Sequence, residues 1–175
     1  MASAGMSRVD LYRAVIRAMV RGGWNDSDSQ IPAYIRLIQR LAWNLFFPNP
    51  ARAMFKEEEC HDAAREALTY YAEDWTPREL LSFLQGRGIL VRPYPGAYSF
   101  LHRTFLEYLS AEEVAVNANR TNDLTAIDPY LWRRPQAQGP WQWTPAAAEM
   151  LRLLAGCLDK PELLLHRLRP PEVVA

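Results

Sequence analysis

The chain has 175 residues, of which 49% are hydrophobic and 11% aromatic, and its basic and acidic side chains balance to a net charge of zero. These proportions exclude a wholly disordered protein, and the balanced charge counts against a surface devoted to nucleic acid or to an anionic membrane. Two cysteines and three histidines are too few for a disulfide scaffold or for a structural zinc site of ordinary ligand spacing.

The location of the protein is predicted from segments that the sequence lacks. No apolar run approaches the roughly 20 residues of a membrane span. Residues 1–8 have no apolar core followed by a small-residue cleavage site, as a signal peptide would. We therefore expect a cytoplasmic protein without a membrane partner.

The first predicted helix covers residues 7–20. Ser7 is a favourable N-cap, and Gly22 with Gly23 ends the helix. Helical spacing predicts one buried face, made of Leu11, Val15, Ala18 and Met19.

Three arginines, Arg13, Arg17 and Arg21, recur every four residues on another face of this helix. Such a row suits a phosphate-binding or partner-binding surface, and it equally suits a solvated face. The sequence favours the solvated face, because rows of like charge are common on helices.

Three more helices are expected in the middle of the chain. Pro32 opens one that ends before Pro48, and a second begins at Phe55. The third has the clearest local signal, since residues 76–79 read Thr-Pro-Arg-Glu, a capping box with proline in the first turn.

A change of period follows this helix. Residues 89–91 and 98–100 are rich in β-forming residues and flank a turn around Gly96, which predicts a short β-hairpin. A long helix follows at about 101–119. This order predicts a mainly α fold, in which a winged-helix domain with a hairpin wing is flanked by helical segments.

Two helices are predicted in the last third of the chain, opening at Thr144 and at Pro161. They form an α-hairpin of the kind that stacks in helical repeats. One hairpin cannot bury both of its faces, so we expect it to pack on the winged helix or on a partner.

The most specific segment lies at residues 98–111, which read Tyr-Ser-Phe-Leu-His-Arg-Thr-Phe-Leu-Glu-Tyr-Leu-Ser-Ala. It closely resembles the winged-helix segment of NACHT-type NTPases, members of the signal-transducing STAND class. Leu106 is the clear departure, because the family commonly has glutamine there. Weaker resemblance extends to four other segments, at 12–24, 37–47, 80–91 and 150–168.

The resemblance implies a division of the chain into three parts. Residues 1–30 correspond to the helical tail of a preceding nucleotide-binding domain, 31–118 to the winged helix, and 119–175 to the start of a repeat-like region. It also implies a regulatory fragment that closes over bound nucleotide and gates activation. The implied partners are a NACHT core, in cis or in trans, and other proteins; nucleic acid is not expected.

His102 is the candidate site residue. It matches the histidine that, in autoinhibited family members, contacts the β-phosphate of bound ADP. Considered without the resemblance, a histidine at this junction of strand and helix caps the helix or fills a polar niche. The resemblance also assigns supporting positions in the motif to Phe100, Thr104, Phe105, Glu107 and Tyr108; Glu107 could pair with Arg103 or Arg65.

A nucleotide-hydrolysing core requires a Gly-x-x-x-x-Gly-Lys-Ser/Thr loop, whose amides and lysine hold the phosphates. Only two of the basic residues are lysine, and neither Lys56 nor Lys160 follows a glycine. No apolar strand ends in paired acids to hold magnesium. We therefore expect no enzyme activity and no cofactor for the chain alone, and ADP or ATP only when it is joined to a core.

Two other functions remain open. A winged-helix regulator could contact DNA phosphates through Arg78, Arg87 and Arg92. A free-standing adaptor would bind only other proteins. A small enzyme lacks support, because His61 and His166 have no nucleophile or paired carboxylate at useful spacing, and Cys60 beside His61 faces another way.

Overall fold

The computed structural model describes residues 6–22, 29–71, 73–133 and 142–168, and helices make up most of them. The α-helices are α1 (Arg8–Arg21), α2 (Ile31–Phe46), α3 (Glu57–Tyr71), α4 (Pro77–Gly86), α5 (Arg103–Thr121), α6 (Asp128–Leu131), α7 (Ala148–Cys157) and α8 (Glu162–Arg167). The strands are β1 (Met54–Lys56), β2 (Leu90–Tyr94), β3 (Ala97–Phe100), β4 (Trp132–Arg133) and β5 (Gln142–Trp143). Short 3-10 turns, η1 (Thr125–Ile127) and η2 (Pro145–Ala147), precede α6 and α7.

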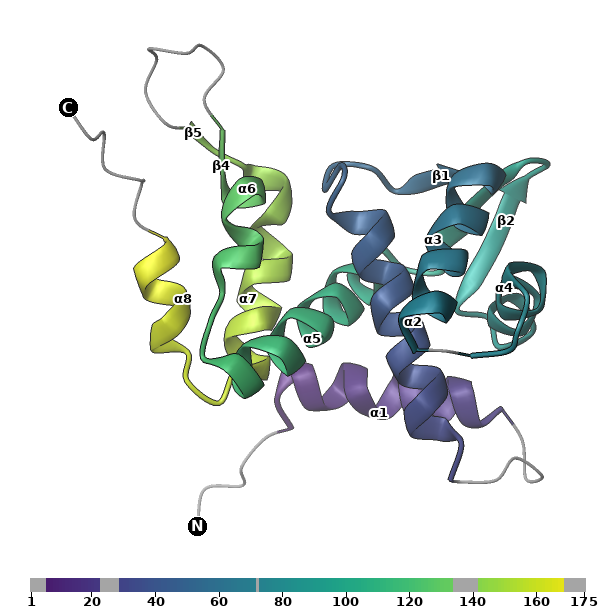
Figure 1. Cartoon of the computed structure of the whole chain (residues 1–175), viewed down its shortest axis with the longest axis horizontal. Helices are drawn as coiled ribbons and strands as arrows, with labels where there is room; N and C mark the ends of the chain where they lie inside the picture. The colour runs from purple at the N-terminus through teal and green to yellow at the C-terminus, as the bar shows by residue number, and fades with distance from the viewer. Residues whose placement is uncertain (1–5, 23–28, 72, 134–141, 169–175) are drawn as a thin grey trace.

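The elements from α2 to β3 form the winged helix that the sequence predicts. Helix α2, strand β1, helices α3 and α4 and the hairpin β2–β3 follow in that order (Figure 1). The strands pair antiparallel in the spatial order β1-β3-β2, so the returning strand of the hairpin lies in the middle of the sheet. The prediction of a mainly α fold with a short hairpin wing is confirmed.

Strand β1 corrects one expectation, because Phe55 begins no helix. It lies in the strand, pairs with Tyr98 of β3 and is only 2% exposed, whereas its neighbours Met54 and Lys56 are exposed. Helix α3 starts at Glu57. A strand of three residues is too short for its alternation to be recognised in the sequence.

The local helix signals are confirmed. The Ser7 hydroxyl accepts a hydrogen bond from the Asp10 N–H, and Gly22 ends α1 in the left-handed region with φ of 56°. Thr76 and Glu79 form the complete capping box at the start of α4. Gly23 lies outside the described residues.

The buried face of α1 differs from the prediction. Val9, Ile16 and Val20 are buried, whereas Leu11 and Ala18 are exposed. Helix α1 packs against α2, α5 and α7 together, so the position of these neighbours decides which residues it buries. The periodicity of α1 alone could not reveal that choice.

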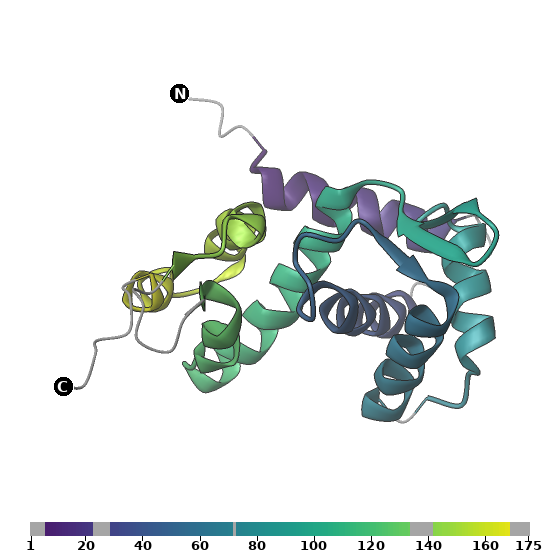
Figure 2. The same cartoon turned by 90° about the horizontal axis from the view of Figure 1, so that it is seen from above.

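Helix α5 joins the two halves of the molecule. It lies between the winged helix and the pair α7 and α8, while α1 runs along one side (Figures 1 and 2). The hairpin α7–α8 packs on the winged helix through α5, with hydrogen bonds from Asn119 Nδ2 to the Cys157 carbonyl and from the Asp159 N–H to Asn119 Oδ1.

A single cluster of buried residues extends from Val9 to Leu164. The boundaries of the three predicted parts therefore remain predictions. Among the described residues, no helix has both the length and the apolar character needed to cross a membrane.

Candidate functional site

His102 occupies the junction between β3 and α5. Its backbone is extended, with φ of −129° and ψ of 137°, and its carbonyl accepts the Phe105 N–H at 2.9 Å. The side chain does not cap the helix; the imidazole meets the Phe105 ring edge-to-face, with the centroids 5.4 Å apart. His102 is exposed, and its ring makes no hydrogen bond within the residues that the structure describes.

The other motif positions are mostly structural. Phe100, Phe105, Glu107 and Tyr108 are buried, and Thr104 is half-buried. The structure thus brings the predicted site residues together as a packed segment from which the His102 ring projects.

The helix predicted from about residue 101 begins only at Arg103. Leu101 precedes it and is 45% exposed. An apolar side chain and an imidazole therefore lie side by side in the chain at the surface.

Arg103 anchors the start of α5. Its Nε donates to Glu107 Oε1 at 2.8 Å, and its terminal nitrogens donate to the carbonyls of Pro50 and Ala51 at 2.6 and 3.1 Å. Burial raises the pKa of Glu107, and Arg103 opposes that rise. Arg65 instead pairs with Asp62, so Arg103 is the partner of Glu107.

A second polar cluster connects α1, α5 and α7. Glu112 Oε1 accepts from Arg13 and from the Tyr108 hydroxyl, both at 2.7 Å, with the Cys157 sulfur 3.7 Å away. Burial, with Glu112 adding to it, raises the pKa of Tyr108 and raises that of Cys157 to about 12. A thiol this strongly protonated is a poor nucleophile.

The arginines suggested for DNA binding do not form one surface. Arg78 and Arg92 line a pocket of about 390 Å³ between α3, α4 and the wing, but Arg92 pairs with Glu57 and lies over the Tyr98 ring. Arg87 lies elsewhere, over Phe83 and against Gly22 at the end of α1.

The residues considered for catalysis or metal binding are dispersed. Cys60 is fully buried, and burial raises its pKa to about 12; His61 borders the pocket beside α4, and His166 is exposed on α8. The described ranges contain no group of three His, Cys, Asp or Glu side chains that could hold a metal ion. Lys160 donates to Asn122, and Lys56 ends strand β1.

The groove between α1 and α2 is predicted only in part by the sequence. Arg17 and Arg21 line this groove, and the arginine row is the sequence signal for it. The α2 side of the groove includes Gln39, a polar residue on the buried face of α2 that the sequence did not indicate as a functional residue.

Comparison of the chain with protein-family models, with curated proteins and with solved structures gives no match. The resemblance to NACHT-type NTPases therefore depends on the sequence of the motif, above all residues 98–111. The function that this resemblance implies is a proposal.

Proposed function

We propose that this chain is a regulatory part of a NACHT-type signalling NTPase, which closes over nucleotide bound by a separate core and gates activation. The observation that carries the proposal is the exposure of His102, whereas the five supporting positions of the motif, Phe100, Thr104, Phe105, Glu107 and Tyr108, are buried or half-buried. Packing accounts for those other residues. It does not account for an exposed imidazole that makes no hydrogen bond in the described part of the chain.

The geometry around His102 suits contact with a phosphate. A neutral imidazole has one N–H to donate, and a protonated one has two. The N-terminus of α5, a helix of 19 residues, adds a favourable field for an anion. Arg103 fixes this end of the helix to the loop after α2, and the Phe105 ring supports the imidazole from one side. The histidine is thus held before a ligand arrives, which lowers the entropic cost of binding.

In the proposed mechanism the winged helix folds over ADP on the core and holds the assembly closed. Sensing of a signal releases it through rotation of the domain, a transition between two discrete packings. A charge-assisted hydrogen bond from His102 to the phosphate contributes about 1.5–3 kcal/mol, or roughly ten- to a hundredfold in nucleotide affinity. The chain does not hydrolyse ATP by itself, because the phosphate-binding loop belongs to the core.

The test begins with the coding sequence that adjoins this chain, in which a Gly-x-x-x-x-Gly-Lys-Ser/Thr segment identifies the core. The core and the chain are then produced together, and the release of labelled ADP is timed. We expect His102→Ala to release ADP about ten- to a hundredfold faster. His166→Ala is the matched control, since His166 is also exposed but lies on α8, and it should leave the rate unchanged.

Two results would contradict the proposal at different levels. Equal ADP release from wild type and His102→Ala would refute the role of His102. Failure of the chain to associate with any such core would refute the regulatory function itself. Binding of the isolated chain to duplex DNA, with a steep dependence on salt, would instead favour the winged-helix DNA regulator.

A further inference from the structure

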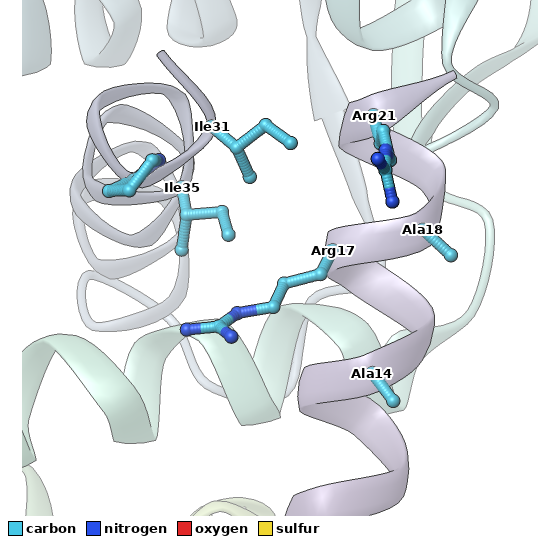
Figure 3. A pocket seen from close by; sticks show the side chains of 7 residues that line it. Ala14, Arg17, Ala18, Arg21, Ile31 and Ile35 are labelled. Atoms are coloured by element: carbon cyan, nitrogen blue, oxygen red, sulfur yellow. The ribbon is translucent and has the colours of Figure 1, made fainter. Parts of the chain in front are cut away.

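A groove runs between α1 and α2, on a surface that the nucleotide proposal does not use. Two adjoining pockets of about 490 and 270 Å³ form it, and they share the lining residues Arg17, Pro32 and Ile35. Figure 3 shows Arg17 extending from α1 across the groove toward Ile35 of α2. Apolar side chains from both helices are among the lining residues of the groove: Ala14, Ala18, Ile31, Pro32 and Ile35.

The charge of the groove is strongly positive. Among the described residues that line it, four are arginines and one is a carboxylate, Glu112. Glu112 already accepts from Arg13, and Arg36 lies beside Tyr71. Arg17 is exposed and makes no hydrogen bond or ion pair within the described part of the chain. The groove therefore combines an uncompensated guanidinium with apolar lining side chains such as Ile31 and Ile35.

An unsatisfied buried amide gives a second, independent indication of a ligand. Gln39 lines the inner pocket and is only 5% exposed, yet its Oε1 accepts no hydrogen bond. A buried acceptor without a donor costs about 1–3 kcal/mol. The cost is removed if a molecule bound in the groove donates a hydrogen bond to this oxygen.

We propose that the groove between α1 and α2 binds an acidic peptide segment of a partner protein. Carboxylate side chains would pair with Arg17 and its neighbours, apolar side chains would contact Ile31 and Ile35, and a backbone N–H would donate to Gln39 Oε1. A phosphate group satisfies the arginines alone, since it brings neither the apolar contacts nor a donor. The peptide meets all three requirements of the groove.

The inference is tested by fluorescence anisotropy with the whole chain and a labelled peptide in which Glu alternates with Leu. Arg17→Ala should weaken binding about ten- to a hundredfold, and salt should weaken wild-type binding. Arg65→Ala is the matched control, because Arg65 is exposed and pairs with Asp62 of the same helix, α3. A peptide with Gln in place of each Glu should bind at least tenfold more weakly.

Gln39→Leu separates binding from folding. This change removes an unsatisfied buried acceptor, so the variant should unfold at the same or a higher urea concentration than wild type. It should nevertheless bind the acidic peptide several-fold more weakly. A purely structural role for Gln39 would leave peptide affinity unchanged.

The proposal is overturned by an absence of binding to the acidic peptide or by equal binding of the Glu and Gln peptides. Unchanged peptide affinity in Arg17→Ala or in Gln39→Leu would overturn it as well. Complete displacement of the peptide by a short single-stranded oligonucleotide at lower concentration would also overturn it, because a phosphate backbone would then be the better ligand.

Discussion

An ion pair between Arg40 and Glu113 joins helices α2 and α5. Glu113 is only 1% exposed, and its two oxygens receive long contacts, 3.3 Å from Arg40 Nη1 and 3.5 Å from the Tyr71 hydroxyl. Arg40 lies over the Tyr70 ring at 4.3 Å, and its Nε is buried without a partner. The carboxylate thus loses its hydration and gains weak compensation in return.

These distances predict asymmetric effects of substitution. Arg40→Met leaves a buried, unpaired carboxylate and should lower the free energy of unfolding by about 3 kcal/mol, or roughly 6–12 °C in Tm. The double variant Arg40→Met with Glu113→Leu should lie within about 1 kcal/mol of wild type, because well-packed apolar groups replace a poorly paired charge.

The measurement is urea denaturation followed by circular dichroism for wild type, both single variants and the double variant. The exposed pair of Arg65 and Asp62 is the control, and its loss should cost less than about 1 kcal/mol. The reasoning is refuted if the double variant is as unstable as Arg40→Met.

The pH dependence gives a separate check on the same carboxylate. Burial raises the pKa of Glu113 in the fold, so the folded state holds this proton more tightly than the unfolded chain. Its contribution to stability is therefore present below the ordinary glutamate pKa of about 4.3, and it is lost as the pH rises through the folded value. Glu113→Gln should remove this decline of stability with rising pH. An unchanged dependence of stability on pH in Glu113→Gln would show that Glu113 does not cause the decline.

Three further predictions concern local features. Gly22→Ala should cost about 1–2 kcal/mol in urea denaturation, because φ is 56° and a Cβ would lie 1.2 Å from Arg87 Nη1; unchanged stability would contradict this. Thr76→Ala should cost about 1 kcal/mol by losing the capping box, whereas Thr69→Ala, inside a helix, should be neutral or stabilising. The Cys157 thiol, with its pKa raised to about 12, should react with iodoacetamide at pH 8 at least about 100-fold more slowly than in urea, and equal rates would refute the shift.

The parts of the fold that the sequence predicts well are those with a local cause. The capping box at Thr76 and the left-handed glycine at Gly22 depend on neighbours within a few residues, and both are found. Strand β1 is different, since Phe55 becomes a strand residue by pairing with Tyr98, far along the chain. The buried side of α1 likewise depends on three helices that pack against it.

In the candidate site, too, features with a local cause could be predicted and those that depend on distant contacts could not. Glu107 and Arg103 are one helical turn apart, so their pairing could be anticipated as one of two alternatives. The exposure of His102 could not, because it depends on where α5 begins and on how the Phe105 ring packs. The unsatisfied oxygen of Gln39 could not be anticipated either, since only the three-dimensional surroundings show that it lacks a donor.

Packed rings connect the two proposed sites. His102 contacts the Phe105 ring, which meets the Tyr12 ring at 6.2 Å, and Tyr12 belongs to the helix whose Arg17 lines the groove. If an occupant of the groove shifts α1, the imidazole at the end of this chain of contacts shifts with it. By linkage, peptide and nucleotide must then change each other's affinity by the same factor. The connection is tested in the complex with the core by measuring how far the peptide changes nucleotide affinity and how far the nucleotide changes peptide affinity. Tyr12→Leu should bring both factors toward one. Factors that Tyr12→Leu leaves unaffected would exclude this route.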